Sequence, residues 1–305
     1  MEFFKSDTKI DFMGRKNYAF AFSIILFIVS IVFTVKNGIN LGLDFTGGTQ
    51  LELKYGSSID IPSVRETINN NELSGAMIQA YGSSDKILIR VPANVNLKSN
   101  EIKNKITSIL PKYTIQRVEF IGPQVGKTLL TNGCTALIIA ILSTMLYIAI
   151  RFEYRFAVSA AISLIHDPIL IIGIFAIYGI EFNLISLAAL LTILGYSLND
   201  TIVVYDRVRE NFRRYRNKNA TEIVNMSINQ TLSRTIMTSG LTSLVVIALI
   251  AYGGEVLQGF SIALLIGIVI GTYSSIFVAG ALAVVLGLDR QSLLPKAKQA
   301  IDTMP

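Results

Sequence analysis

A carboxylic acid stands inside a long apolar stretch of this sequence, where a charged group is costly. Asp200 belongs to the segment GYSLNDTIVVYD (195–206), and the apolar run around it extends from Phe182 to Val204. A charge at the centre of a membrane-spanning helix costs about 2.5–3.5 kcal/mol on insertion scales. A carboxyl group removed from water binds a proton more readily, and a nearby cation has the opposite effect. An acid that alternates between these environments can load and release a proton, so Asp200 is a candidate for proton-coupled work.

The alternative is a static buried acid, neutral or paired, that holds helices together. At 100° per residue, five side chains share a helix face with Asp200, most of them small or hydroxyl-bearing: Ser186, Ala189, Ile193, Tyr196 and Ser197. Such a face suits either helix packing or a water-filled crevice. The pattern leaves both interpretations open.

Arg234, in LSRTIMTSGLTSL (232–244), is the candidate cationic partner at the start of the fifth apolar stretch. If the fourth and fifth stretches form antiparallel helices, both residues lie toward the same membrane face. Helical side chains lean toward the N-terminus of their helix, which here directs Arg234 toward the interface. The guanidinium group can instead extend to the lipid headgroups, so direct pairing with Asp200 is not assured.

Two further ionisable residues, His166 and Asp167, lie in the tripeptide HDP (166–168) of another apolar stretch. Pro168 frees a backbone carbonyl group in a helix, and neighbouring polar groups can satisfy it. His166 and Asp167 are therefore weaker candidates for proton transfer, with a structural role as the alternative. Gly267 and Gly271, in GIVIG, form a small-xxx-small motif that is typical of helix packing.

The composition of the chain indicates that these residues lie in membrane-spanning segments. The 305 residues are 51% hydrophobic and only 16% charged, with a mean hydropathy of +0.54, whereas soluble domains carry about 25% charged residues. Apolar stretches close to the roughly 20 residues that cross a bilayer occur at 19–35, 133–150, 156–178, 182–204, 236–252 and 258–286. We therefore predict an α-helical polytopic membrane protein with six transmembrane helices. The first stretch has no A-x-A cleavage site after it, so we expect it to be retained.

The distribution of Lys and Arg predicts the orientation. With the N-terminus inside, 16 of the 27 basic residues fall in the inner segments 1–18, 151–155, 205–235 and 287–305. By the positive-inside rule, the N-terminus (1–18) and the tail (289–305) are cytoplasmic and the long segment 36–128 is periplasmic. The basic cluster RVRENFRRYRNK (207–218) is then a determinant of topology, and a nucleic-acid site is improbable.

The segment 36–128 has the pattern of a small soluble domain. Strand-like runs occur at 49–55, 76–83, 85–92 and 113–122, and helix-like runs at 61–71 and 97–110. The order βαββαβ predicts a ferredoxin-like α+β domain between the first two spans, followed by a five-helix bundle within 129–288. GPQVGKT (122–128) resembles a phosphate-binding loop but is one residue too short, so we expect a flexible connection there.

Neither His166, the only histidine, nor Cys134, the only cysteine, has a recognisable catalytic or metal-ligating setting. One cysteine also allows no internal disulfide. We therefore expect no enzymatic activity, no metal and no cofactor, with protons as the coupling ion.

Three motifs, in the right order and location, resemble SecF, a family of bacterial protein-export membrane proteins within the SecD/SecF group. They are LGLDFTGGTQLEL (41–53), RFEYRFA (151–157) and GYSLNDTIVVYDRVREN (195–211). The resemblance covers nearly the whole chain and implies one half of a twelve-helix assembly of the resistance-nodulation-division type. The family-motif residues in this sequence are Asp44, Gly47, Gly48, Asn199 and Thr201.

The resemblance also implies a function and partners. In the family, an acid of the fourth span and an arginine at the start of the fifth are implicated in proton movement, and Asp200 and Arg234 match them. A heterodimer with SecD beside the SecYEG translocon, with YajC as a further candidate, would use the proton motive force across the inner membrane. Its outer domains would capture unfolded preprotein. Two other functions stay open: a proton-coupled small-molecule efflux half-transporter, and a non-transporting scaffold for the translocon.

Overall fold

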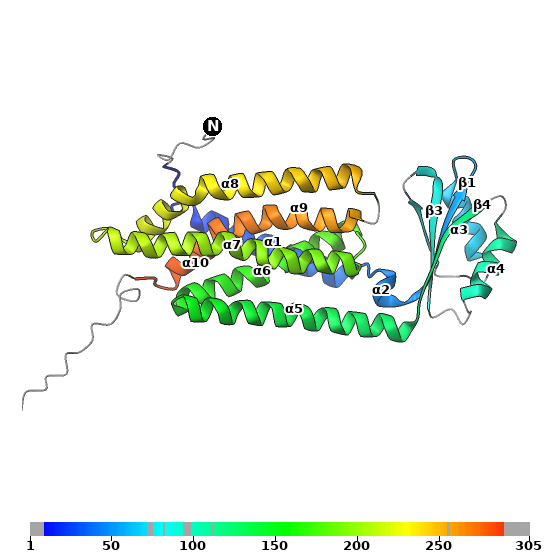
Figure 1. The fold of residues 1–305 in the computed structure, drawn as a ribbon, viewed down its shortest axis with the longest axis horizontal. Helices are drawn as coiled ribbons and strands as arrows, with labels where there is room; N and C mark the ends of the chain where they lie inside the picture. Colours follow the sequence, from blue (N-terminus) through cyan, green and yellow to red (C-terminus); the bar gives the residue numbers. More distant parts are fainter. Residues whose placement is uncertain are drawn as a thin grey trace, which may run out of the picture.

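The computed structural model describes residues 9–71, 73, 76–81, 83–93, 99–110, 113–254 and 257–289. In this part of the chain, six long apolar helices run side by side as an elongated bundle (Figure 1). They are α1 (Lys16–Asn37), α5 (Pro123–Arg151), α6 (Tyr154–Tyr178), α7 (Leu184–Arg214), α8 (Ala220–Tyr252) and the segment Gln258–Val285. The bundle confirms the predicted polytopic α-helical membrane protein.

The last span is interrupted by a π-helical turn. It consists of α9 (Gln258–Tyr273), the π-helical turn η2 (Ser274–Ala279) and α10 (Gly280–Val285). Such turns are rare, and they occur frequently at functional sites. The apolar pattern over 258–286 gives no sign of this turn, because it records side-chain polarity and not backbone hydrogen bonding.

A small antiparallel sheet lies between α1 and α5, at one end of the bundle (Figure 1). Its strands are β1 (Gly48–Tyr55), β2 (Met77–Tyr81), β3 (Ser83–Pro92) and β4 (Tyr113–Ile121), in the order β2-β3-β1-β4. Helices α3 (Ile61–Asn69) and α4 (Ser99–Ile109) complete the predicted βαββαβ unit. Alternate strand residues such as Leu51 and Ile89 are fully buried against Ile68 and Ile106 of the helices. We call this unit the sheet domain.

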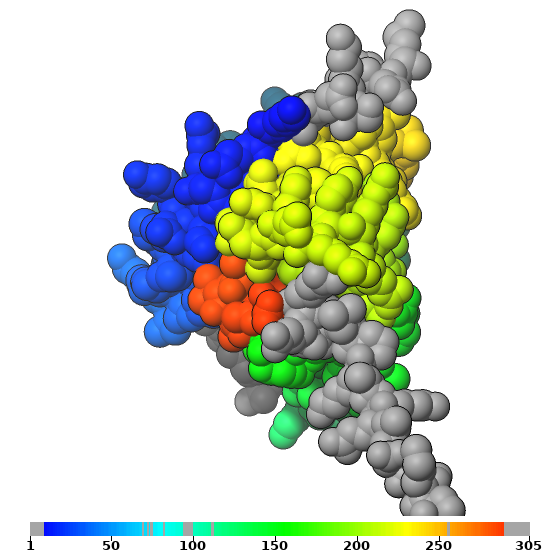
Figure 2. Space-filling model, turned by 90° about the vertical axis from the view of Figure 1, so that its left-hand side faces the viewer, coloured from blue at the N-terminus to red at the C-terminus, as the bar shows by residue number. Residues whose placement is uncertain are grey.

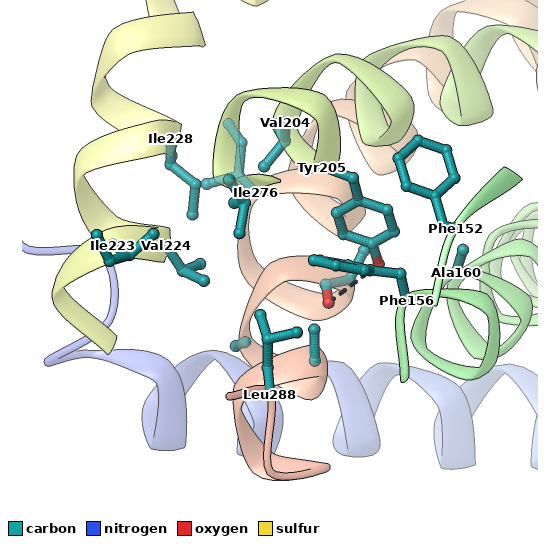
Figure 3. Packing of buried hydrophobic residues seen from close by; sticks show 14 of the residues in the cluster. Phe152, Phe156, Ala160, Val204, Tyr205, Ile223, Val224, Ile228, Ile276 and Leu288 are labelled. Carbon is teal, nitrogen blue, oxygen red and sulfur yellow. Dashed lines mark hydrogen bonds between the residues drawn. The ribbon is translucent and has the colours of Figure 1, made fainter. Parts of the chain in front are cut away.

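The largest apolar cluster of the bundle lies toward the end away from the sheet domain and centres on Tyr205 (Figure 3). The Tyr205 ring packs 4.5 Å from the Phe156 ring and 5.9 Å from the Phe152 ring, measured between centroids. Its hydroxyl group lies 2.7 Å from the Ser159 hydroxyl and donates a 3.3 Å hydrogen bond to the carbonyl oxygen of Ala279. A fully buried tyrosine thus secures the end of the π-helical turn.

Several boundaries differ from those predicted. Helix α5 begins at Pro123, directly after the N-cap Gly122, so 123–128 is its start and not a flexible connection. Proline suits this position because the first helical N–H groups have no partner inside the helix. The strands of the sheet domain end at Ile121, short of the predicted boundary at 128. Most of the predicted terminal segments, 1–8 and 290–305, lie outside the described residues.

Helices α7 and α8 extend well past their predicted membrane ends, leaving only 215–219 between them. The extensions form because Val208 and Phe212 of α7 are buried together with Val224 and Ile228 of α8. A hydropathy pattern marks only the continuously apolar part of a helix. These extensions are amphipathic, so their mean hydropathy is too low for the pattern to include them.

Candidate functional site

A buried polar cluster around Asp167 joins α6, α7 and the π-helical turn. The Asp167 side chain is 1% exposed, and its Oδ2 accepts hydrogen bonds from the hydroxyl groups of Ser197 (2.7 Å) and Ser274 (2.8 Å). Its Oδ1 lies 3.0 Å from Nδ1 of His166, whose ring stacks on Phe27. Both carboxylate oxygens therefore have partners, and one acid ties three helical segments together.

Asp200 lies three residues after Ser197 on α7, and its environment is different. The residue is only 4% exposed, and its buried Oδ2 has no hydrogen-bond partner among the residues that the structure describes. A buried polar atom normally has a partner, and leaving a carboxylate oxygen without one is costly. Unlike Asp167, Asp200 is therefore not held in one arrangement by hydrogen bonds to both of its carboxylate oxygens.

Arg234 lies on α8 about four turns after the helix begins and directly before the apolar stretch predicted at 236–252. Its side chain is exposed on the helix surface. Within the described part of the chain, no ion pair joins the two side chains. The two candidates therefore share a region without direct contact.

A second chain of hydrogen bonds links α7, α8 and α9 through hydroxyl groups. Tyr196 donates to the hydroxyl oxygen of Ser239 (3.3 Å), which lies 2.8 Å from the hydroxyl oxygen of Thr272. Thr201, one residue after Asp200, is buried and donates to the backbone carbonyl of Ser197 (3.2 Å). Asn199 is exposed on the outer surface of α7. The turns of α7 around Asp200 are therefore polar on several sides.

Gly267 and Gly271 allow α9 to approach α7 closely. A Cβ atom at Gly267 would lie 2.3 Å from Cδ1 of Ile193, and one at Gly271 would lie 3.0 Å from Cβ of Ser197. Small residues at such positions are the usual means by which membrane helices pack closely. The packing holds α9 against the face of α7 that also carries Asp200.

Gly267→Leu should therefore loosen this contact and destabilise the protein by about 1–3 kcal/mol, as overpacking of a tight contact does. The measurement is the thermal unfolding midpoint of the full chain in detergent micelles. Gly240→Leu is the matched control, because a Cβ atom at Gly240 on α8 would meet nothing within 4 Å. Equal midpoints for the two variants would contradict the close α7–α9 packing.

The segment LDFTGG fastens the beginning of the sheet domain to the N-terminus of α7. Asp44 Oδ2 accepts a 2.9 Å hydrogen bond from the backbone N–H of Leu184, the first residue of α7. An acid at this position satisfies a helix N–H and complements the helix dipole. Gly47 and Gly48 have φ angles of +67° and +135°, and a Cβ atom at Gly48 would lie 2.4 Å from the Val91 carbonyl oxygen. Only glycine fits this turn.

An ion pair and two backbone hydrogen bonds connect the same region to the turn between α6 and α7. Arg90 of β3 pairs with Glu181, and its Nε donates to the side-chain oxygen of Gln50 (2.8 Å). The backbone of Phe182 exchanges hydrogen bonds with Asn40 (2.8 Å) and Gly42 (2.9 Å). We call the group Asp44, Arg90, Glu181 and Phe182 the α7 clamp. It connects the N-terminus of α7 to the sheet domain and to the segment that leads into it.

Residues 101–289 match the family described as protein export membrane protein SecD/SecF, C-terminal, and residues 32–59 match the SecD/SecF GG motif. The chain is 41% identical over 303 residues to the protein translocase subunit SecF of Pseudomonas aeruginosa, covering 97% of this chain and 98% of that protein. It is 42% identical over 290 residues to SecF of Escherichia coli O157:H7, covering 93% and 90%.

This chain belongs to the SecD/SecF family.

A solved structure of the SecD/SecF family has the same fold. The crystal structure of SecDF from Thermus thermophilus, described as a translocon-associated membrane protein, aligns with a TM-score of 0.84 at 35% identity. The alignment covers 93% of this chain but only 39% of the SecDF chain. A second SecDF structure, in a super-membrane-facing form, aligns with a TM-score of 0.69 at 36% identity. This SecD/SecF chain therefore corresponds to about two fifths of SecDF.

The structure gives the SecD/SecF motif residues physical roles and adds one residue, Ser274, that the sequence did not indicate. Asp44, Gly47 and Gly48 lie within the GG-motif match: Asp44 caps α7 as part of the α7 clamp, and the two glycines form the turn that follows it. Ser274, the partner of Asp167 on η2, was missed. Its only sequence signal is the cluster of hydroxyl side chains in GTYSS (271–275) within an otherwise apolar stretch.

Proposed function

We propose that this chain is a SecF-like accessory subunit of the Sec translocase that uses the proton motive force to complete preprotein translocation. Similarity to SecF proteins over nearly the whole chain supports the translocase role. The single observation that supports proton coupling is the buried Oδ2 of Asp200, which has no hydrogen-bond partner among the described residues. Asp167, whose two oxygens are both hydrogen-bonded, is by contrast a fixed anchor.

The proton cycle follows from these environments. A neutral Asp200 fits its buried position, whereas the ionised form is favoured when the Arg234 charge approaches. Moving one charge through 100 mV supplies about 2.3 kcal/mol, which shifts a two-state equilibrium roughly fifty-fold. Protons are the coupling ion in this proposal, which includes no cofactor and no enzymatic activity.

The α7 clamp offers a direct route from Asp200 to the sheet domain. Asp200 and the helix N-terminus held by Asp44 belong to one helix, α7, so the two move together as parts of one rigid element. A shift of α7 on protonation therefore changes the position of the sheet domain. In the proposed topology, the sheet domain is periplasmic, the termini are cytoplasmic, and the membrane is the bacterial inner membrane.

SecD is the proposed partner on the outer surface of α7. Thr192, Gly195 and Asn199 are exposed there, at helical spacing, in the turns that precede Asp200. Exposed polar residues on a membrane-spanning helix favour contact with another protein over contact with lipid. We further propose the SecYEG translocon, YajC and unfolded preprotein as partners, and no nucleic acid.

Complementation tests the translocase role. Bacterial cells depleted of their own SecF would express this chain together with the SecD from the same source. We expect processing of a secreted preprotein to be restored, whereas an Asp44→Ala, Gly48→Val variant that disrupts the GG-motif turn should fail. Normal membrane levels of the wild-type chain without any restored processing would contradict the proposal.

A further inference from the structure

The end of the bundle opposite the sheet domain contains a cavity whose lining, in the described part of the chain, consists of charged side chains. Arg151, the last residue of α5, faces a group on the end of α7: Asp206, Arg209, Glu210, Arg213 and Arg214. The cavity has a volume of about 570 Å³. Figure 2 views the molecule from this end, where the end of α7 (yellow-green) lies above the ends of α5 and α6 (green).

Two of the arginines are held in place by a buried aromatic ring. The guanidinium carbons of Arg151 and Arg209 lie 5.2 and 5.5 Å from the centre of the Phe152 ring, which is 6% exposed. Asp206 pairs with both arginines, at 3.3 and 3.7 Å. A guanidinium group has five N–H donors, so each arginine keeps donors for a further ligand. The site is therefore partly preorganised.

The charges leave an excess of positive potential in the cavity. Glu210 is paired at 2.6 Å with Arg207, which lies outside the cavity lining. Among the described residues, Arg213 forms no ion pair with an acid. The cavity lining therefore contains four arginines and, besides Glu210, one carboxylate, that of Asp206. Arginine clusters of this kind suit the planar recognition of phosphate oxygens.

The surface next to the cavity indicates the source of the phosphate. On α5, the apolar side chains that precede Arg151 are strongly exposed, with Leu146 at 62% and Ile150 at 79%. Tyr147 and Tyr154 are exposed beside them, and tyrosine is enriched where lipid tails meet headgroups. Acyl chains that cover this surface place their headgroup at the arginines. We propose that the cavity binds the phosphate of an anionic phospholipid and so bridges the ends of α5 and α7.

Lipid binding to the purified full chain tests this proposal. Native mass spectrometry in detergent micelles would count bound dioleoyl phosphatidylglycerol, with dioleoyl phosphatidylcholine and inorganic phosphate as separate probes. The test variant is R151Q/R209Q/R213Q. The matched control is R15Q/K16Q/K218Q, which removes three charges at the same end of the molecule but outside the cavity. R213Q/R214Q is a milder second variant, because it removes no ion pair between described residues.

We expect the affinity for phosphatidylglycerol to fall about tenfold or more in the triple variant, and measurably in R213Q/R214Q, while the control keeps the wild-type affinity. Phosphatidylcholine should bind the wild type more weakly than phosphatidylglycerol does. Equal losses in the test and control variants would overturn the proposal, because the effect would be one of overall charge. Occupancy by inorganic phosphate at the same concentration as the lipid would overturn the assignment to a lipid.

Discussion

Asp200→Asn should abolish proton-driven export while leaving the fold intact. The substitution keeps the size of the side chain but removes the group that can bind and release a proton. Because Oδ2 of Asp200 has no hydrogen-bond partner in the described part of the chain, little stabilising interaction is lost. We expect a thermal unfolding midpoint close to that of the wild type and preprotein processing reduced to the level of cells without the chain.

Asp167→Ala provides the contrast that separates a coupling acid from an anchoring acid. This substitution leaves the hydroxyl groups of Ser197 and Ser274 and Nδ1 of His166 without their common partner. The loss should destabilise the protein by about 1–3 kcal/mol, measured by thermal unfolding in micelles.

Asp60→Asn serves as the control for both substitutions, because Asp60 is an exposed acid of the sheet domain. It should change neither stability nor export. Full export by Asp200→Asn at normal membrane levels would contradict the assignment of Asp200. The reverse pattern, with Asp200→Asn unstable and Asp167→Ala stable, would exchange the two roles.

Reversing the charge at either end of the Arg90–Glu181 ion pair should uncouple the sheet domain from α7, and reversing both should restore coupling. The two side chains are only 13% and 22% exposed, so a single reversal places two like charges in a half-buried site. We expect an interaction free energy of about 1–3 kcal/mol between Arg90→Glu and Glu181→Arg in a double-mutant cycle.

Two readouts would show whether the pair transmits movement or only stabilises the fold. Spin labels at Asn104→Cys and Tyr178→Cys, in a Cys134→Ser background, report the distance between the sheet domain and the end of α6. Single reversals should broaden this distance distribution and reduce export, and the double reversal should recover both. Lys54→Glu is the control, because the Lys54–Asp85 pair lies wholly within the sheet domain. Broad distributions in the double reversal would contradict the clamp.

Hydropathy and period-2 alternation were sufficient to predict six spans and the βαββαβ domain, because burial in lipid or in a small core dictates residue type directly. The ends of α7 and α8 could not be predicted in this way. Val208 and Phe212 are apolar residues among charged ones, and only their burial with Val224 and Ile228 explains the helical extensions.

The candidate site was predictable only in part. Asp200 stood out because an acid in an apolar run is costly, but the sequence could not tell it apart from Asp167 by hydrogen bonding. The partners of Asp167 come from 30 and 107 residues away, and only packing brings them together. The positive φ angles at Gly47 and Gly48 and the cap by Asp44 likewise depend on the docking of distant segments.

The most direct test of the account compares preprotein release with the proton gradient present and collapsed. Spheroplasts would contain the wild-type chain or Asp200→Asn, each expressed with SecD, and release of a secreted preprotein would be followed over time. We expect release by the wild type to slow strongly when the gradient collapses, whereas Asp200→Asn should be slow in both conditions. An equal response of both chains to the gradient would contradict it and leave Asp200 as a structural residue.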